Sequence, residues 1–344
     1  MSVMQKFIKQ SLIFLFLSGS FSVFAAVSGK SAPASQTCTV TVVQKNSNAA
    51  PSIQMKDAPK KTSTPTEVKL KQQIQELQNK ITVQNSVLAK QRHQQAAIAD
   101  NPLGIAFDEP TYILPFYYTF TPDQTIYAGQ TPDQQTLNKA EFKMQFSLLI
   151  PIIHHLFFNN LGLDCSYTQL AYWQFYAKSQ YFRETDYEPA IFLTGHLLEN
   201  AGWRFGFVHQ SNGRGGDYER SWNRLYLDWR ISGQSWLLSI KPWMLVFKSE
   251  SSSLHNPDIA RYLGNERIML AYHAYHQTFS IMARNTVESG FKRGAMEADW
   301  DFPLPFTNKL RGYVQLFSGY GQSLIEYNHY TNAAGIGIAL SNWI

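Results

Sequence analysis

The chain has 344 residues, of which 44% are hydrophobic, 14% aromatic and only 16% charged, and its formal net charge is +5. This composition can bury or coat a large apolar surface, which excludes a disordered chain. The positive charges are spread along the chain rather than gathered into a basic stripe, so we predict that it has no nucleic-acid partner.

The first 26 residues have the pattern of a secretory signal peptide. A short basic start precedes an apolar run from Leu12 to Phe24, and small residues surround the end of this run. We therefore predict a signal peptide over residues 1–26 that is cleaved after Ala25 or Ala26. The alternative, a membrane anchor, is disfavoured because the run is short and is interrupted by Gly19.

No later segment supplies the ~20 unbroken apolar residues that a membrane-spanning helix needs. An exported chain that is rich in aromatic residues and has no such helix is either a soluble secreted domain or a transmembrane β-barrel. The two cysteines, Cys38 and Cys165, lie in regions of different character. Export permits a disulfide between them, but the sequence does not support one.

Residues 27–100 combine a linker with a helical segment. Ser, Thr, Lys, Pro and Ala dominate from Ser28 to Pro65, a composition that cannot offset its chain entropy by burial. From Glu67 to about Ile98, apolar residues recur at the a and d positions of a heptad, and glutamines fill the other seam positions. The apolar residues are Leu70, Ile74, Leu77, Ile81 and Leu88. We predict a short helix that either self-associates or lies solvated on a barrel mouth, and the sequence leaves both alternatives open.

Strict alternation of apolar and polar residues begins after Pro102. In KAEFKMQFSLLI, the residues from Ala140 to Ile150 at even numbers are apolar and share one face, while polar residues share the other. Strand-like stretches follow with short turns near 162–176, 184–197, 201–213, 220–232, 235–249, 265–289, 292–302, 306–318 and 323–344. Their lengths are near the ~10 residues with which a tilted strand crosses a bilayer.

We therefore predict an all-β fold, a transmembrane antiparallel β-barrel of about twelve strands over residues 101–344. Thr111 to Phe120 is either a strand or a leading segment, and GIGIALSNWI at the C-terminus is the closing strand. Tryptophans near the strand ends indicate an interfacial girdle. They are Trp173, Trp203, Trp222, Trp229, Trp236, Trp243 and Trp343.

Alternation places three polar residues on the apolar face of two neighbouring strands. His209 and Ser211 follow Trp203, Phe205 and Phe207 on one face of AGWRFGFVHQSN, and Asn223 precedes two leucines on the same face of RSWNRLYLDW. Polar groups that face lipid cost free energy, which makes them a functional-site hypothesis.

Ser211, His209 and Asn223 have the residue types of a nucleophile, a base and the partner that orients the base. The turn that follows could complete the site. Gly213 offers a backbone N–H close to Ser211, and residues 214–219 offer the oxygen donors that calcium prefers. The alternative is a hairpin turn with a chance His-x-Ser pair, because Ser, Asn, Gly and Asp are also typical turn residues.

The segment HQSNGRGGDYERSWNRLY resembles the active-site segment of the outer-membrane phospholipase A family. Further similarities are SYTQLAYWQ (166–174), FRETDYEP (182–189), KPW (241–243), NPDI (256–259) and QLFSGYGQSLIEYN (315–328). Together they extend from about Lys139 to the C-terminus. The resemblance implies a twelve-stranded barrel in the Gram-negative outer membrane. It also implies calcium-dependent hydrolysis of acyl esters in phospholipids and lysophospholipids, with phospholipase A1 and A2 activity, and activation by homodimerisation.

The same resemblance assigns roles to individual residues. Ser211 corresponds to the nucleophile, His209 to the base, Asn223 to the orienting residue and the Gly213 N–H to the oxyanion donor. By the same resemblance, the expected Ca²⁺ ligands are the Arg214 carbonyl, Glu219 in place of a family serine, and Ser179 contributed by the other subunit.

Further positions match the family or depart from it. Gln169 corresponds to a glutamine at the family's dimer seam, and Gln210 replaces an acidic residue on the inward face. The altered stretch KSESSSLH (248–255) leaves the monomer's calcium aspartate unassigned, and residues 28–98 have no counterpart. The rival hypothesis is a porin-like or structural barrel without catalysis.

Overall fold

The computed structural model of the chain describes residues 65–99, 104–156, 161–247, 255–285, 289–290 and 292–344. The predicted signal peptide, most of the linker and Cys38 lie outside these residues. Every described element belongs to one compact unit, residues 62–344. Among the described residues, no helix is both long and apolar enough to cross a membrane.

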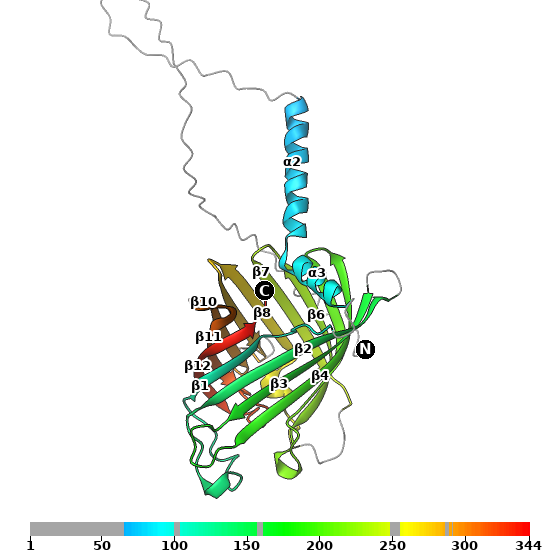
Figure 1. Cartoon of the computed structure of the whole chain (residues 1–344). Coiled ribbons are helices and arrows are strands. Elements are labelled where there is room, and N and C mark those ends of the chain that lie inside the picture. The colour runs from blue at the N-terminus through cyan, green and yellow to red at the C-terminus, as the bar shows by residue number, and fades with distance from the viewer. Residues whose placement is uncertain (1–64, 100–103, 157–160, 248–254, 286–288, 291) are drawn as a thin grey trace, which may run out of the picture. The chain divides into compact units, whose positions relative to one another are not determined.

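Twelve antiparallel strands close into one barrel, in which β1 pairs with β12 and every other pair consists of consecutive strands (Figure 1). The strands are β1 (Thr111–Thr119), β2 (Ala140–Leu156), β3 (Leu161–Trp173), β4 (Phe182–Leu198), β5 (Ala201–Ser211), β6 (Ser221–Ser232), β7 (Trp236–Leu245), β8 (Glu266–Ala274), β9 (Gln277–Arg284), β10 (Ala295–Leu304), β11 (Thr307–Tyr320) and β12 (Tyr330–Ser341). The predicted fold class and strand number are confirmed, and the segment that begins at Thr111 is a strand.

Two predicted strands were wrong in extent. The stretch 265–289 contains both β8 and β9, which are joined at Tyr275 and His276. Both of these residues have positive φ, as a tight two-residue hairpin turn requires. At the C-terminus, β12 begins only at Tyr330, because residues 321–329 form a loop.

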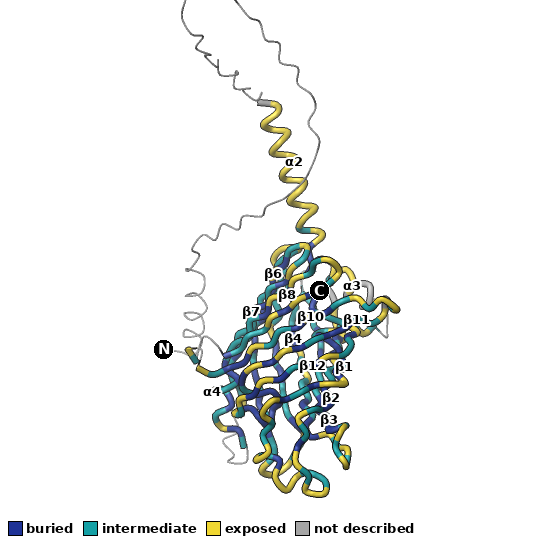
Figure 2. The backbone as a smooth tube through the Cα atoms, turned by 90° about the vertical axis from the view of Figure 1, so that its left-hand side faces the viewer, coloured by how far each residue is buried: buried dark blue, intermediate teal, exposed yellow. Residues whose placement is uncertain are grey.

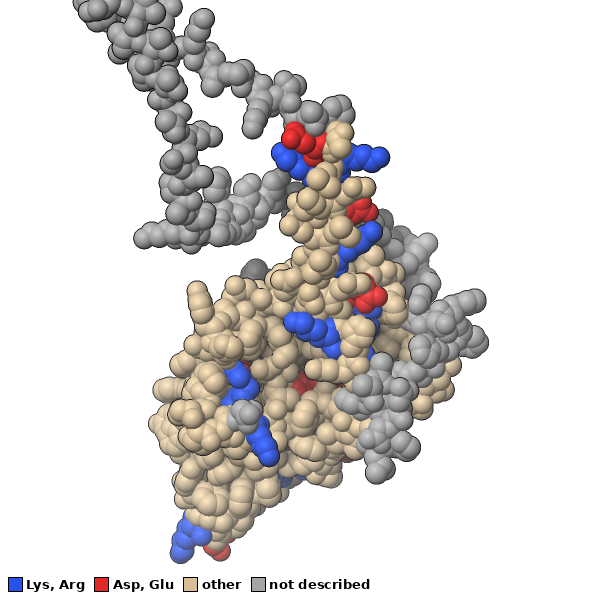
Figure 3. All heavy atoms as spheres, turned by 45° about the horizontal axis from the view of Figure 1, so that its top comes forward, with Lys and Arg blue, Asp and Glu red and all other residues tan. Residues whose placement is uncertain are grey.

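Apolar and polar residues alternate between the outer wall and the lumen. On β2, Phe146 and Ile150 are 47% and 44% exposed, while Glu141 and Lys143 are buried, as predicted. Figure 2 shows this alternation as bands of buried and exposed residues along the strands. On the face in Figure 3, charged side chains are sparse over the barrel. Many charged residues, such as Glu141, Lys143 and Asp228, are buried in the lumen, where side chains fill a barrel of this size.

The predicted tryptophan girdle is wrong for three of its members. Trp222 and Trp243 are buried in the lumen, where their ring centroids lie 6.1 Å apart in an edge-to-face contact. Trp343 is buried in a cluster with α3, the helix described below. Trp222 and Trp243 occupy inward positions of their strands, so position near a strand end did not determine which face they take.

The predicted single helix from Glu67 to Ile98 is two helices, α2 (Pro65–Gln84) and α3 (Val87–Ala99). The helical conformation is interrupted at Asn85 and Ser86. The Ser86 hydroxyl accepts a hydrogen bond from the N–H of Ala89 at 3.3 Å, as an N-cap does at the start of a helix. This cap starts α3 in a new direction and interrupts the heptad pattern.

Helix α3 packs on the end of the barrel that has the short turns. Leu88 is buried in a cluster with Leu237 and Met269. The N–H of Leu88 donates to the hydroxyl of Ser232 at 3.1 Å, and the N–H of Val87 donates to the Gly233 carbonyl at 2.9 Å. Helix α3 therefore lies on the barrel mouth, but its first residues are buried there rather than solvated as that alternative supposed. The seam residues of α2 are exposed, and its self-association stays a prediction.

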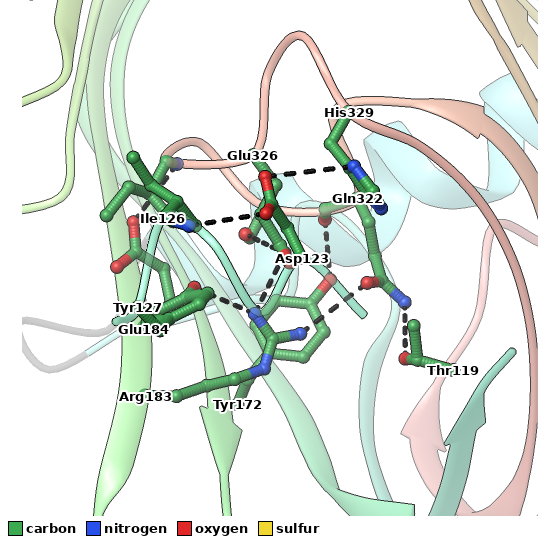
Figure 4. A network of polar contacts seen from close by, with 12 residues as sticks. Thr119, Asp123, Ile126, Tyr127, Tyr172, Arg183, Glu184, Gln322, Glu326 and His329 are labelled. Atoms are coloured by element: carbon green, nitrogen blue, oxygen red, sulfur yellow. Dashed lines mark hydrogen bonds and ion pairs between the residues drawn. The ribbon is translucent and has the colours of Figure 1, made fainter. Parts of the chain in front are cut away.

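Long loops at the opposite end of the barrel surround a buried polar network. Arg183 of β4 binds Glu141 of β2 at 2.7 Å and Glu326 of the 321–329 loop at 2.8 Å. Figure 4 shows Arg183 between Tyr127, Tyr172 and the loop. These bonds hold the loop inside the barrel, beside the strands that carry the predicted site. The remaining short helices are η1 (Pro132–Gln134), η2 (Gly216–Tyr218) and α4 (Ala260–Leu263).

Candidate active site

The predicted base and its orienting partner are in contact on the outer face of the barrel. Strands β5 and β6 pair in a register that places His209 opposite Asn223, and Nδ1 of His209 lies 2.8 Å from Oδ1 of Asn223. An amide oxygen can only accept, so Nδ1 carries the proton in this contact and Nε2 is free to accept one. The neighbouring Val208 and Trp222 are buried in the lumen, so His209 and Asn223, each one residue further along its strand, face outward as predicted.

Ser211 ends β5, two residues beyond His209. Successive residues of a strand rise ~3.3 Å, so the two side chains share a face about 7 Å apart along the strand. The sheet register also sets Ser211 opposite Tyr187 of β4 and Ser221 of β6. The three predicted catalytic side chains therefore lie on one outward surface, at the end of the barrel where the long loops emerge.

The loop that follows Ser211 is organised around a buried side chain, that of Asn212. Its amide oxygen accepts the N–H of Arg220 at 3.0 Å, and its amide nitrogen donates to the carbonyl of Tyr218 at 2.8 Å. Gly213 follows with a φ of +63°, and a Cβ there would lie 3.1 Å from the ring of Tyr187. Both the dihedral angle and the close ring favour glycine at this position, two residues after Ser211.

The predicted metal ligands lie in two different loops. Arg214 and Glu219 belong to the β5–β6 loop, where the N–H of Glu219 donates to the Gly216 carbonyl at 3.1 Å. Ser179 belongs to the β3–β4 loop, and its hydroxyl donates to a carboxylate oxygen of Asp133 at 2.5 Å. No group of three His, Cys, Asp or Glu side chains able to hold a metal occurs in the part of the chain that the structure describes.

Burial and polar neighbours at the base of the loops shift the pKa values of two residues, Arg220 and Tyr327. Burial lowers the pKa of the Arg220 guanidinium, and Tyr327 and Glu184 oppose this shift. Burial raises the pKa of the Tyr327 phenol, and its hydrogen bond to Asp258 at 2.7 Å raises it further. Tyr327 therefore stays protonated at neutral pH and acts as a donor that ties two loops together.

Sequence reasoning missed two contacts of the β5–β6 loop. Glu184 binds the Arg214 side chain from inside the barrel at 2.8 Å, although strict alternation along β4 does not place both Arg183 and Glu184 inward. His255, at the end of the altered stretch KSESSSLH, lies 3.1 Å from Asp217. The rest of that stretch lies outside the described residues. The only sequence signal that pointed to Glu184 as part of the site was the match of FRETDYEP (182–189) to the family.

Comparison with known proteins identifies the family of this barrel. A family model described as phospholipase A1 matches residues 88–340. The phospholipase A1 of Klebsiella pneumoniae is 35% identical over 253 residues, which cover 71% of this chain and 84% of that protein. The phospholipase A1 of Escherichia coli K12 is 33% identical over 279 residues, which cover 78% and 91%.

Two solved structures show the same fold. The outer membrane phospholipase of Salmonella typhi, a dimer with bound calcium, is 30% identical with a TM-score of 0.65 and covers 72% of this chain and 97% of its own. Outer membrane phospholipase A from Escherichia coli is 30% identical with a TM-score of 0.63 and covers 70% and 99%. Fold and sequence therefore agree, and the chain belongs to the phospholipase A1 family of ester hydrolases.

Proposed function

We propose that this protein is an outer-membrane phospholipase that hydrolyses acyl esters of phospholipids and lysophospholipids at both the A1 and A2 positions. The observation that carries the proposal is the bond of 2.8 Å between His209 and Asn223 on the outward face of the barrel, two residues from Ser211. Membership of the phospholipase A1 family supports the same activity. A site on the outer wall meets lipid directly, whereas a porin acts through its lumen.

The three residues divide the chemistry as follows. Ser211 Oγ attacks the acyl carbonyl while Nε2 of His209 takes its proton, and Asn223 holds the imidazole through Nδ1. His209 then gives this proton to the departing glycerol oxygen, which leaves an acyl ester on Ser211. Water, deprotonated by His209, cleaves that ester, and His209 returns the proton to Ser211 Oγ as the fatty acid is released. The N–H of Gly213 stabilises the oxyanion in both halves.

Calcium fits the donors that the loops offer. The Arg214 carbonyl and the Glu219 carboxylate are oxygen ligands in one loop, and hard cations such as Ca²⁺ prefer oxygen. When bound beside Ser211, Ca²⁺ would supply positive charge for the developing oxyanion. Ser179, on a separate loop, would be contributed by a second subunit. The dimeric, calcium-bound state of the Salmonella typhi relative supports this arrangement.

We also propose that the active form is a homodimer in the outer membrane, reached through a cleaved signal peptide. On the outer face of β3, the Tyr167 hydroxyl donates to Oε1 of Gln169 at 2.9 Å. An amide on a lipid-facing surface is costly alone but can pair across two subunits. Each chain alone would lack the partner's Ser179, so the monomer would be dormant.

Hydrolysis of phospholipid in detergent micelles tests the proposal. We expect the purified protein to release fatty acid with calcium and to stop when a chelator is added. Ser211→Ala and His209→Ala are each expected to lower kcat by at least about a thousandfold, because they remove the nucleophile and its base. A protein without calcium-stimulated release would instead support the rival hypothesis of a non-catalytic barrel. A fully active Ser211→Ala variant would rule out Ser211 as the nucleophile.

A further inference from the structure

A β-bulge in β4 turns two consecutive charged residues into the lumen. Along the β3–β4 pairing, Tyr172 lies opposite Glu184 and Trp173 opposite Phe182, so Arg183 is the extra residue. As a result Arg183 and Glu184 are only 2% and 1% exposed, although neighbours on a regular strand point to opposite faces. Bulges re-aim side chains in this way and are frequent next to active sites.

Glu184 reaches from the lumen to both sides of Gly213. Its Oε1 accepts the side-chain amide of Asn212 at 3.0 Å, and its Oε2 accepts Nε of Arg214 at 2.8 Å. The Arg214 guanidinium also donates to the carbonyl of Arg183. In this clamp Glu184 is buried, and its bond with the partly exposed Arg214 guanidinium is charge-assisted, which makes it stronger than a bond between neutral groups.

The clamp determines the course of the backbone after the nucleophile. Asn212, held by Glu184, binds the N–H of Arg220 and the carbonyl of Tyr218 and so closes the loop on itself. Gly213 lies between the two residues that Glu184 holds. The direction of the Gly213 N–H and of the Arg214 carbonyl therefore depends on the position of one carboxylate.

The same bulge connects the active-site loop with the loop inside the barrel. Oε1 of Glu184 also accepts the N–H of Ile325 at 3.2 Å, and Arg183 binds Glu326 at 2.8 Å. Figure 4 shows Arg183 and Glu184 beside Glu326. Two residues thus anchor the internal 321–329 loop and brace the β5–β6 loop on the outer side.

We infer that Glu184 is a positioning residue for the reaction proposed above: from within the lumen it aims the oxyanion-binding N–H of Gly213 and the calcium-binding carbonyl of Arg214. Glu184 does not touch the substrate and acts through Asn212 and Arg214. The inference rests on the proposed function.

The variant Glu184→Gln tests this role, because it keeps the size of the side chain and removes the charge that holds Arg214. We expect kcat to fall by about tenfold or more. Complete loss of one oxyanion donor lowers kcat by a factor of about 10²–10³, and a misplaced donor loses part of this factor. KM should change little, because the acyl chains bind on the outer wall. The calcium concentration for half-maximal activity should rise.

Glu109→Gln is the matched control. It breaks a carboxylate–arginine pair of similar geometry, Glu109 to Arg267 at 2.7 Å, at the other end of the lumen. We expect its kcat and calcium requirement to match the wild type. An equal loss of kcat in both variants would indicate general loosening of the barrel and would overturn the inference.

The outcomes separate this inference from the proposed function. If wild-type protein is inactive, the proposed function fails. If wild-type protein is active and folded Glu184→Gln, checked by heat-modifiable gel mobility, keeps kcat within about twofold, only the positioning role fails. Should Glu184→Gln not assemble, Arg214→Gln removes the same ion pair from the loop side. An unchanged kcat in Arg214→Gln overturns the inference, and a loss matching the expected one supports it.

Discussion

At the scale of single residues, strand parity decides which groups meet. Because the side-chain period of a strand is two, His209, Ser211 and Asn223 could be assigned to one face from the sequence, and the register then set His209 against Asn223. Glu184 escaped the same reasoning because a one-residue bulge shifts the parity of β4 at Arg183. The face of a side chain can be predicted from alternation only where the pairing of the strand with its neighbours is regular.

Glu219 is the proposed Ca²⁺ ligand at which this chain departs from the family pattern. We expect Glu219→Ala to raise the calcium concentration for half-maximal hydrolysis by about tenfold, because a charged oxygen donor is lost from the loop. Calcium titration of fatty acid release measures this. Asp217→Ala is the control, because the Asp217 side chain is 90% exposed and faces His255. Identical titrations for Glu219→Ala and wild type would exclude Glu219 as a ligand.

At the scale of elements, helix α3 shows how tertiary contacts override a continuous pattern. The heptad repeat runs from Leu70 through Leu88 without a break in the sequence. Helix α2 nevertheless ends before Ser86 and α3 begins after it, because Ser86 caps α3 and Leu88 packs against Leu237 and Met269. Helical periodicity identifies an apolar stripe but not the surface that the stripe contacts.

Removal of the Leu88 side chain should loosen α3 without opening the barrel. We expect Leu88→Ala to cost about 2–3 kcal/mol of the free energy with which α3 packs on the barrel, from lost burial and a residual cavity. Limited proteolysis should then cut within residues 87–94 faster, while heat-modifiable mobility is unchanged. Leu77→Ala on α2 alters a side chain that is 58% exposed and should behave as wild type. Equal protection of Leu88→Ala and wild type would contradict the packing described for α3.

At the scale of the whole molecule, buried and largely buried ion pairs lie at both ends of the barrel. Arg183 with Glu141 and Glu326 holds the loop at one end, and Asp108 with Arg204 holds the segment before β1 at the other, at 2.5 Å. Buried charges are costly unless paired, so each pair is strongly destabilising to break.

The Asp108–Arg204 pair makes barrel stability depend on pH. Burial alone would raise the pKa of the Asp108 carboxyl, but Arg204 and Arg230 lower it, and the net pKa lies below the ordinary value. The stabilisation is therefore present above the unfolded pKa of about 3.9 and is lost as pH falls through the folded pKa. We expect Asp108→Asn to cost about 3 kcal/mol at pH 7, and less as the pH falls below about 4. Thermal unfolding of both proteins in detergent across this pH range measures the cost of the substitution. A cost independent of pH would refute the predicted role of the Asp108 charge.

Much of this protein is determined by its sequence alone. Alternation with period two, strand length and the lack of long apolar helical segments predict a closed barrel, and parity within β5 and β6 predicts an outward polar trio. These properties are local, because each depends on the pleat of one strand and on which face is apolar.

Tertiary structure alone decided the rest. The bulge at Arg183, the inward tryptophans, the break before α3 and the bonds from Glu184 to Asn212, Arg214 and Ile325 all depend on partners distant in the chain. A buried charge goes where an opposite charge or a donor can satisfy it, and that partner is known only once the barrel has closed. The outward face of His209, Ser211 and Asn223 could therefore be predicted, whereas the contacts in the lumen behind it could not.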